Sequence, residues 1–559
     1  MWGSKLSAVL SALSLTAVPA TEVEADLAIV ESNVKQVAII GAGAGGASTA
    51  YYLQQYAEAE GLPVNITVFE KTDHIGGRTL TVDAYNNPLE PVELGASIFI
   101  EANHILYNAS RRFGLPLKEP ESGSDGFLGI WDGEKFVYTQ DDSSWEWWNL
   151  AKLFWKYGLA PYKAQKLVQS TVATFLQLYE APHFPFRSLT QRAFELDLLK
   201  ATSVTGDQFL ANNDIGELFS QHIIQAATRV NYASNLKYIH GLETMVSMAP
   251  EGAKQVIGGN WLIFDTMLQR TNATVNRNTS VASIEVKSGP TSSKYLLSTK
   301  SAHSEAEADA ERYPVAFDNV VIAAPWQYSD IKVSEGLFQH KIDEIPYTRL
   351  HVTLFASPFR LSPEFFGLQP GSKAPDTVLT TLNAADEAKA GADGAGKAGF
   401  YSISTLRTAT NPETLKDEFL YKIFSPNKVT AEFLSGLLGV KVPEAIVSNG
   451  EEEAGAVSPI SWYHPHVFDS YPIEYPRVTF QDPILRDGLY YLSGMESFIS
   501  CMETSALMGM NVAKLIAEDF AGPAEAAKTE DEKVDKIGAD GAQEVLAQSE
   551  KEAPIPDEL

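Results

Sequence analysis

A glycine-rich turn near the N-terminus carries the strongest chemical signal in the sequence. Gly41, Gly43 and Gly46 stand at the spacing G-x-G-x-x-G, directly after the apolar run 36–40 and before a helix-prone stretch, 47–56. In this context Gly41 permits a tight turn, Gly43 lets the backbone approach a pyrophosphate, and Gly46 lets helix and strand pack closely. The helix N-terminus attracts the negative charge of the phosphates. The turn therefore predicts a dinucleotide site.

A second strand and a second glycine pair make that prediction more specific. The run 65–69 ends in Glu70, close to the offset at which a carboxylate binds ribose hydroxyls, and an acid there favours a ribose without a 2′-phosphate. Gly76, Gly77 and Arg78 follow. A nicotinamide dehydrogenase does not need this second loop, whereas its N–H groups and Arg78 suit the pyrophosphate and flavin end of FAD. An unrelated glycine-rich turn is the alternative.

Two later segments predict the remaining elements that position this site. The run 318–325 is typical of a buried strand that returns to the nucleotide domain and ends in small residues near the cofactor. The segment 487–496 predicts a strand that breaks at Gly494 and leads into a helix over 506–516. Such a turn points N–H groups at an anion or at an electron-accepting ring.

Together with Glu93-Leu94-Gly95-Ala96, these motifs resemble the FAD-dependent amine-oxidase and phytoene-desaturase-like superfamily. Within it, further stretches are similar to the prenylcysteine oxidase family, also called prenylcysteine lyase. They are Arg229-Val230-Asn231-Tyr232, Gly258-Gly259-Asn260, Val378-Leu379-Thr380-Thr381, Lys422-Ile423-Phe424-Ser425, Trp462-Tyr463-His464-Pro465-His466 and the block 490–505. The likeness runs from about residue 35 to 518.

The resemblance implies an FAD-dependent oxidoreductase that cleaves the thioether of farnesyl- or geranylgeranyl-cysteine during the degradation of prenylated proteins. With oxygen and water as co-substrates, the products would be cysteine, a prenyl aldehyde and hydrogen peroxide. Loss of hydride from the carbon next to sulfur gives a sulfur-stabilised allylic cation, to which water adds before the hemithioacetal collapses. This route needs no covalent nucleophile, which suits a chain with a single cysteine, Cys501. Cys501 as a covalent flavin tether is weighed against a small buried residue.

The candidate site residues follow from the motifs and the resemblance. Those for cofactor binding are Gly41, Gly43, Gly45, Gly46, Glu70, Lys71, Gly76, Gly77, Arg78, Gly95, Ala96, Gly494, Met495, Glu496, Met502 and Glu503. Glu503, His464 and His466 are candidate catalytic residues, because a general base for the water is expected near the flavin. For Glu503 the alternative is a helix N-cap or capping box, and for the histidines a surface turn around Pro465. No metal-ligand spacing is present among the histidines, so no metal site is predicted.

We therefore predict an α/β protein with a Rossmann-type FAD-binding domain and an interleaved, partly helical α+β substrate domain. The FAD-binding domain comprises 34–118, 250–335 and 484–520, and the substrate domain comprises 119–249 and 336–483. Within the latter, 145–179 has helical apolar spacing that suits core packing, a tunnel for a prenyl chain or a peripheral membrane contact. The Ala-, Gly- and Asp-rich stretch 384–399 predicts a flexible insertion.

Charge and composition exclude several other classes of protein. The 559 residues carry 43 basic against 71 acidic side chains, a net charge of −28, which argues against binding to nucleic acid or to an anionic membrane surface. At 45% hydrophobic and 20% charged residues, the composition is that of a folded protein. One cysteine rules out an intramolecular disulfide and a dithiol redox centre. Oligomeric state is left open.

The two ends of the chain predict its route through the cell. Residues 1–20 read as a cleavable secretory signal, too short in its apolar part to span a membrane, and no other stretch is long enough. N-x-S/T sequons at Asn65, Asn108, Asn272 and Asn278 suit the secretory pathway. The resemblance favours the lysosome or vacuole, with the ER lumen or the exterior as alternatives. Residues 521–559 predict a disordered acidic tail ending in Pro-Asp-Glu-Leu.

Two other functions remain open at this stage. An amine or polyamine oxidase of the same fold would surround the flavin with an aromatic cage, which the sequence cannot place. A non-catalytic flavoprotein that carries a prenyl or lipid ligand would bind FAD without being reduced by substrate.

Overall fold

The computed structural model describes residues 34–120, 126–141, 146–250, 252–288, 293–304, 310–449 and 458–521. The predicted signal segment and nearly all of the predicted acidic tail lie outside these ranges. Within them, no helix combines the length and the apolar character needed to cross a bilayer.

A six-stranded sheet carries the predicted nucleotide site at its centre. Its strand order is β20-β21-β13-β1-β2-β9, and β1 pairs in parallel with both β2 and β13. The strands are β1 (Lys35–Ile40), β2 (Val64–Phe69), β9 (Thr274–Asn276), β13 (Asn319–Ile322), β20 (Ile484–Arg486) and β21 (Leu489–Tyr491). The four predicted strands are confirmed. They read as continuous apolar runs because this parallel sheet is covered on both faces.

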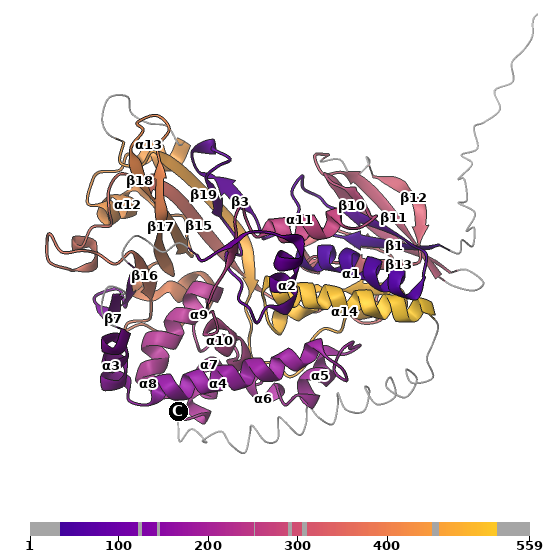
Figure 1. Ribbon diagram of the computed structural model, residues 1–559, viewed down its shortest axis with the longest axis horizontal. Coiled ribbons are helices and arrows are strands. Elements are labelled where there is room, and N and C mark those ends of the chain that lie inside the picture. The colour runs from indigo at the N-terminus through magenta and orange to yellow at the C-terminus, as the bar shows by residue number, and fades with distance from the viewer. Residues whose placement is uncertain are drawn as a thin grey trace, which may run out of the picture. The chain divides into compact units, whose positions relative to one another are not determined.

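Helices cover one face of this sheet and a second, smaller sheet covers the other (Figure 1). The helices are α1 (Ala44–Glu60), α2 (His104–Phe113), α11 (Trp261–Gln269) and α14 (Met502–Ala521). The smaller sheet has the order β12-β11-β10-β14, with β10 (Thr279–Ser288), β11 (Ser293–Ser301), β12 (Glu311–Phe317) and β14 (Lys332–Val333). The helix α14 lies against α1 so closely that a Cβ on Gly509 would stand 2.3 Å from the carbonyl oxygen of Gly45. This contact returns the C-terminal segment to the glycine turn.

A seven-stranded, mainly antiparallel sheet forms the other half of the fold, in the order β19-β15-β18-β17-β16-β6-β7. Its strands are β6 (Phe127–Trp131), β7 (Phe136–Asp141), β15 (Tyr347–Ser357), β16 (Thr377–Thr380), β17 (Ser402–Thr410), β18 (Asp417–Ser425) and β19 (Trp462–Pro472). One face packs under α12 (Ala431–Leu438) and α13 (Glu444–Asn449). The opposite face, which we call the inner face, packs against β3 (Thr81–Asp83) and β4 (Pro91–Glu93) of the nucleotide half. Two short strands, β5 (Leu117–Lys118) and β8 (Gln255–Val256), pair separately.

Further helices lie between these halves, and all of them except α9 contribute residues to the core of α1 and α14. They are α3 (Glu146–Tyr157), α4 (Ala160–Phe175), α5 (Leu189–Glu195), α6 (Leu199–Thr202), α7 (Gly206–Asn212), α8 (Glu217–Phe219), α9 (Gln225–Tyr232) and α10 (Gly241–Ser247). The helical spacing predicted for 145–179 is confirmed by α3 and α4. The predicted α/β fold with a partly helical α+β half is confirmed by the sheets and these helices.

The prediction of a flexible insertion at 384–399 was wrong. The guanidinium of Arg229, which is fully buried, donates to the carbonyl oxygens of Gly394 (2.7 Å) and Ala395 (2.9 Å). Asn235 donates to the carbonyl oxygen of Lys389 at 2.9 Å. A buried guanidinium needs an acceptor for each of its N–H donors. Arg229 on α9 finds acceptors of this kind in the backbone carbonyl oxygens of 384–399 and so holds the segment in place. Composition alone does not reveal such contacts.

Candidate active site

The first glycine turn leaves room beside the N-terminus of α1. Gly41 has φ of 103°, a conformation that favours glycine, and a Cβ on Gly46 would stand 1.9 Å from the carbonyl oxygen of Gly41. A Cβ on Gly43, by contrast, would meet no atom closer than 3.8 Å, its nearest neighbour being Gly77. The first N–H groups of a helix have no partner within it. An anion placed next to Gly43 would therefore accept hydrogen bonds from these N–H groups.

The second glycine loop lies directly against the first. Gly76 and Gly43 form an isolated parallel bridge, and the N–H of Gly76 donates to the carbonyl oxygen of Ala42 at 3.0 Å. Gly76 has φ of 122°, and a Cβ there would stand 2.5 Å from the carbonyl oxygen of Thr79. Gly77 is exposed. The structure thus brings the two predicted loops together as a pyrophosphate and flavin site requires.

Glu70 is buried at the end of β2 with its carboxylate turned toward the first loop. It accepts hydrogen bonds from the N–H of Ala42 (2.8 Å), the N–H of Thr72 (2.9 Å) and the hydroxyl of Thr72 (2.8 Å). This fixes an acidic group beside the glycine turn, where the ribose of an adenosine would lie. Lys71 is exposed. Together, the open space at Gly43, the bare helix N-terminus and the fixed carboxylate fit FAD.

The segment around Gly95 is locked to the second loop. A Cβ on Gly95 would stand 1.8 Å from the carbonyl oxygen of Arg78, so only glycine allows this approach, and the N–H of Ala96 donates to the same oxygen at 3.4 Å. Nζ of Lys422 donates to the carbonyl oxygen of Glu93 (2.8 Å) and to the hydroxyl of Ser97 (2.9 Å). Three of the resembling stretches therefore meet here, because Asn260 also donates its N–H to the Glu93 carboxylate at 2.7 Å.

Burial shifts both ionisable groups at this junction. It raises the pKa of Glu93 to about 7 and lowers the pKa of Lys422 to about 8, and each shift is opposed by the charge of the other group. The Lys422 side chain lies on the inner face of the seven-stranded sheet. Lys422 belonged to a resembling stretch, but its residue type alone did not mark it as part of the site.

The C-terminal turn is joined to the second loop by an ion pair. Nη2 of Arg78 lies 2.6 Å from Oε2 of Glu496, which also accepts from the hydroxyl of Tyr347 at 2.9 Å. Nη1 of Arg78 donates to the carbonyl oxygen of Ser470 at 2.8 Å. Arg78 is thereby held between the turn and β19, and its predicted contact with the flavin end stays a prediction.

The rest of the turn is packed tightly. A Cβ on Gly494 would stand 2.5 Å from the carbonyl oxygen of Gln481, and Met495 and Met502 are buried. Cys501 is half-buried, and burial raises the pKa of its thiol to about 11. A Cβ on Gly45 would face the carbonyl oxygen of Ser505 at 3.2 Å, so the turn reaches the start of α1.

Glu503 caps a helix, but a different one from the helix that carries it. Its two carboxylate oxygens accept from the N–H groups of Ile105 (2.8 Å) and Leu106 (3.0 Å) at the start of α2, and one also accepts from the hydroxyl of Tyr179 at 2.8 Å. Burial raises the pKa of Glu503 to about 7, against the effect of these donors. The carboxylate thus joins α14, α2 and Tyr179, and its role as a base stays a prediction.

The predicted surface turn around Pro465 is wrong, because His464 and His466 lie within β19. Their side chains share one face of the strand and form a stacked row between Trp462 and Phe468, with the His464–His466 centroids 6.5 Å apart. Both are half-buried, and burial lowers the pKa of each imidazole. Among the hydrogen bonds of the described residues, none joins them to the glycine loops, so their catalytic role stays a prediction.

A buried pair of carboxyl groups under the C-terminal turn was missed from the sequence. Glu243 (0% exposed) and Glu474 (2%) lie close enough to influence each other's ionisation, and the N–H of Ser500 donates to Glu243 at 3.2 Å. Burial raises the pKa of Glu243 to about 8 and that of Glu474 well above its ordinary value. Two carboxylates cannot both stay charged in such a place, so the pair retains a proton at neutral pH.

No sequence pattern predicts that Glu243 and Glu474 lie together. Glu243 lies on α10 and Glu474 in the loop after β19, and the N–H of His240, just before α10, donates to the carbonyl oxygen of Glu474 at 2.9 Å. The loop that carries Glu474 begins near Ser470, which accepts from Arg78. The carboxyl pair and the Arg78–Glu496 pair therefore stand at two ends of the same turn.

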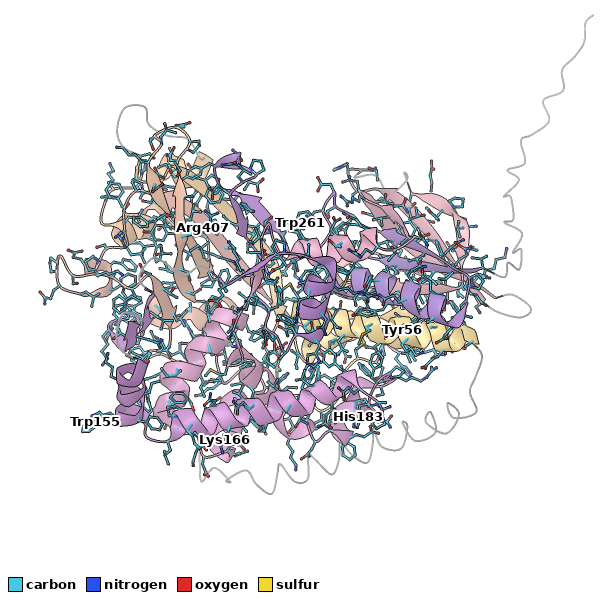
Figure 2. The ribbon with its side chains drawn as sticks, in the orientation of Figure 1. Tyr56, Trp155, Lys166, His183, Trp261 and Arg407 are labelled. Atoms are coloured by element: carbon cyan, nitrogen blue, oxygen red, sulfur yellow. The ribbon has the colours of Figure 1, made fainter. Side chains whose placement is uncertain are left out.

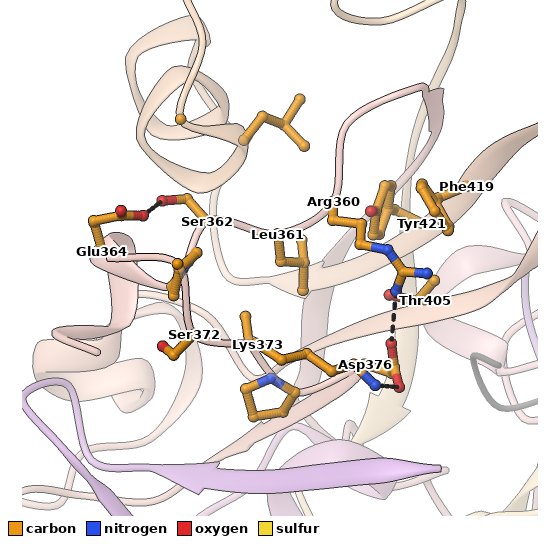
Figure 3. Close-up of a pocket in the computed structure, with 16 residues that line it drawn as sticks. Arg360, Leu361, Ser362, Glu364, Ser372, Lys373, Asp376, Thr405, Phe419 and Tyr421 are labelled. Carbon is orange, nitrogen blue, oxygen red and sulfur yellow. Dashed lines mark hydrogen bonds and ion pairs between the residues drawn. The ribbon is translucent and has the colours of Figure 1, made fainter. Parts of the chain in front are cut away.

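A cavity of about 460 Å³ opens on the far face of the seven-stranded sheet and is separate from this site (Figure 3). Tyr421 lines it, whereas the next residue, Lys422, lies on the inner face. The carboxylate of Asp376 pairs with Lys373 at 3.2 Å and lies 3.9 Å from Arg360, so the charged groups of the cavity satisfy one another. Elsewhere in the described ranges, no group of three or more His, Cys, Asp or Glu side chains is arranged to hold a metal.

Comparison with known proteins places this geometry in a family. A family model described as prenylcysteine lyase matches residues 140–530, and one described as an NAD(P)-binding Rossmann-like domain matches 39–112. The chain is 27% identical to a farnesylcysteine lyase of Arabidopsis thaliana over 87% of its length and 88% of the relative's. It is 28% identical to prenylcysteine oxidase 1 of Homo sapiens over 86% of its length and 88% of the relative's.

Solved structures share the fold at low sequence identity. A fatty acid isomerase from P. acnes, described as producing CLA, superposes with a TM-score of 0.54 at 13% identity, over 86% of this chain and 98% of that one. Cyclohexylamine oxidase from Brevibacterium oxydans superposes with a TM-score of 0.51 at 15% identity, over 87% and 99%. These likenesses concern the fold alone.

Proposed function

The chain belongs to the prenylcysteine lyase family, and we propose that it cleaves S-prenyl-L-cysteine oxidatively. It is an FAD-dependent oxidoreductase acting on a thioether. Oxygen and water would be consumed, and cysteine, a prenyl aldehyde and hydrogen peroxide would be formed. The observation that carries the proposal is that the family likeness spans both halves of the fold, the nucleotide half with its glycine loops and the seven-stranded sheet that faces it.

Bound FAD supplies the hydride acceptor for such a reaction. The residues that would hold it are those at the meeting point of the two loops: Gly43 and the α1 N-terminus for the pyrophosphate, Glu70 for the ribose, and the loops around Gly76 and Gly95 for the remainder. The Arg78–Glu496 pair would keep the C-terminal turn against them. Glu70 already accepts three hydrogen bonds, and it would bind the ribose hydroxyls through its remaining lone pairs.

The inner face of the seven-stranded sheet suits a prenyl chain. Val352 and Leu354 on β15 are fully buried in its core cluster, whereas Trp462 and Phe468 on β19 are only partly buried against that cluster and would contact such a chain. Lys422 emerges on the same face beside Glu93. A long apolar chain lying there would gain about 0.8 kcal/mol for each buried CH₂ group. Its cysteinyl end would lie toward the glycine loops.

Water addition to the oxidised thioether releases a proton, and the chain offers two places for it. The carboxyl pair Glu243–Glu474 has oxygens without a donor among the described residues, whereas Glu503 already accepts three hydrogen bonds. The pair lies beneath the turn that holds Cys501. These contacts favour the pair as the group that takes up the proton and later returns it to the leaving sulfur.

Compartment and partners are also proposals. We propose that the protein acts in the secretory pathway, most simply in the lysosome or vacuole, on a small prenylcysteine substrate. Three of the four sequon asparagines, Asn65, Asn108 and Asn272, have exposed side chains, which supports glycosylation. Asn65 is exposed although its strand is largely buried, because its side chain lies near the start of β2.

Anaerobic flavin spectroscopy tests the proposed reaction. Purified holoprotein is mixed with farnesylcysteine in the absence of oxygen, and air is then admitted while peroxide is assayed. Bleaching of the flavin band, followed by peroxide formation on reoxidation, is the expected result. A spectrum that farnesylcysteine leaves unchanged but a polyamine bleaches would overturn the proposal in favour of an amine oxidase. A flavin that neither compound reduces would indicate a carrier.

A further inference from the structure

The outer surface of α3, α4 and α8 exposes large apolar side chains that the core does not need. Trp155 is 94% exposed, and the surface also includes Phe154, Leu159, Tyr162 and Leu218, exposed by 39%, 63%, 48% and 50%. Figure 2 shows Trp155 projecting away from the fold beside α3, with Lys166 farther along the same edge. We call these five residues the apolar patch. Large apolar side chains exposed together on neighbouring helices mark an interaction surface.

The packing of these helices explains why the side chains of the apolar patch stay exposed. Tyr157, Ala160 and Ala164 are buried against the core, so α3 and α4 are already anchored by their inner faces. Phe219 packs its ring against Tyr157 with centroids 5.4 Å apart, while its neighbour Leu218 stays half exposed. The patch is therefore a second apolar face on helices whose first apolar face is already buried in the core.

The charge around the patch is the reverse of that of the whole chain. The chain carries 71 acidic residues, but none of them lies between Glu146 and Glu180. The same stretch contains four exposed lysines, Lys152, Lys156, Lys163 and Lys166. Lys163 lies 3.7 Å from Asp214 on the α8 side, where Glu217 is also exposed. Lys166 lies over the ring of Tyr162 at 4.8 Å. Charges separated by more than a Debye length of about 10 Å are screened, so this local balance matters more than the net charge of −28.

We propose that the apolar patch and its lysines dock the enzyme on the surface of an anionic phospholipid bilayer. A Trp flanked by Lys side chains on a helix is the arrangement that inserts at the level of the headgroups, with the lysine stems along the apolar layer and their charges at the phosphates. A second copy of this chain that docked through its own patch would bring four more lysines against these four, and like charges facing each other oppose such self-association.

The docking helices lead directly to the candidate site. After α4 the chain reaches Tyr179, whose hydroxyl donates to Glu503 at 2.8 Å, and Phe175 at the end of α4 has its ring 6.4 Å from that of Phe498 in the C-terminal turn. A surface that touches lipid is thus one helix away from the residues around the cofactor. A prenylated substrate, which partitions into membranes, could be taken up along this path; that advantage rests on the proposed function, whereas the docking does not.

Vesicle co-sedimentation of the full-length holoprotein tests the docking without substrate. We expect binding to vesicles of phosphatidylcholine mixed with phosphatidylserine to exceed binding to phosphatidylcholine alone and to weaken with salt. Trp155→Ser should lower the partition coefficient about tenfold. Lys152→Glu with Lys166→Glu should lower it about fivefold for each lysine lost, on the anionic vesicles only. Leu89→Ser and Lys441→Glu change exposed residues outside the patch and should bind as the wild type does.

Absence of wild-type binding, or equal binding by all variants, would overturn the proposal. So would a wild-type dimer in light scattering that Trp155→Ser converts to a monomer without any vesicle binding, since the patch would then join two copies. As a second readout, Trp155→Ser should raise KM for farnesylcysteine presented in vesicles and leave kcat and KM in detergent unchanged. If farnesylcysteine is not a substrate, this second readout fails while the vesicle binding still decides the docking.

Discussion

Arg78 and Glu496, 418 residues apart in the chain, form a 2.6 Å ion pair that fastens the C-terminal turn to the second glycine loop. The Glu496 side chain is 5% exposed and the Arg78 side chain 36%. Tyr347 and the carbonyl oxygen of Ser470 supply the other partners, so β15 and β19 join at the same point. Nucleotide half and substrate half are thus coupled through one guanidinium.

Replacing Arg78 should therefore loosen both halves. Arg78→Met leaves the buried Glu496 carboxylate with the Tyr347 hydroxyl alone, and we expect a loss of about 2–4 kcal/mol of unfolding free energy together with weaker FAD retention. Chemical denaturation and the flavin-to-protein absorbance ratio measure the two effects. The matched control is Lys254→Met, which breaks an exposed pair with Glu119 and should cost less than about 1 kcal/mol. Equal losses in the two variants would contradict the coupling.

Gly43→Val should give a folded protein without FAD. A Cβ at this position meets no atom within 3.8 Å, so the chain can accommodate it, while the added side chain occupies the place expected for the pyrophosphate. The flavin spectrum after purification and a thermal melt of the apo-protein check both halves of this expectation. Gly216→Val, at a glycine whose Cβ would have open space and whose φ of −62° is ordinary, should keep its flavin. A Gly43→Val variant with a full complement of FAD would refute the site.

Glu503→Gln should reduce stability more than turnover. The carboxylate accepts three hydrogen bonds, and the amide nitrogen of Gln cannot accept, so one N–H at the start of α2 or the Tyr179 hydroxyl loses its partner, at about 1–3 kcal/mol. Denaturation and kcat, measured on the same preparation, separate the two roles. A large fall in kcat with unchanged stability would instead support Glu503 as the base.

The pair Glu243–Glu474 should make stability fall as pH rises. Because folding raises the pKa of Glu243 from 4.5 to about 8, the folded state binds more protons between these values, and the stabilisation is full below pH 4.5 and lost as pH rises toward 8. Each proton bound in excess changes the unfolding free energy by about 1.4 kcal/mol per pH unit.

Glu243→Gln tests this dependence. The amide cannot ionise and can donate to Glu474, so the decline of stability across this pH range should be shallower than in the wild type. Denaturation midpoints measured at a series of pH values give the two slopes, with the exposed Glu119→Gln as control. Parallel slopes for Glu243→Gln and the wild type would show that the pair does not hold the proton.

Short stretches of sequence determine the main elements of the nucleotide half of this protein. The glycine spacing, the apolar runs of β1, β2 and β13 and the acid at Glu70 are each fixed by neighbours a few residues away, since a turn that needs positive φ, or a strand buried on both faces, selects its residue types directly. The same holds for the amphipathic spacing of α3 and α4, whose outward apolar face only the burial pattern revealed.

Tertiary structure alone decided which polar side chains act together. The cap role weighed for Glu503 falls on α2 and not on its own helix, and His464 and His466, for which a surface turn was the alternative to catalysis, stack along β19. The pairs Arg78–Glu496, Glu93–Lys422 and Glu243–Glu474 join segments far apart in the chain. Pairing of this kind depends on distance and burial, and a buried charge takes whichever partner the fold brings within a few ångströms. The sequence thus determined the cofactor's cradle, and packing determined the groups that face it.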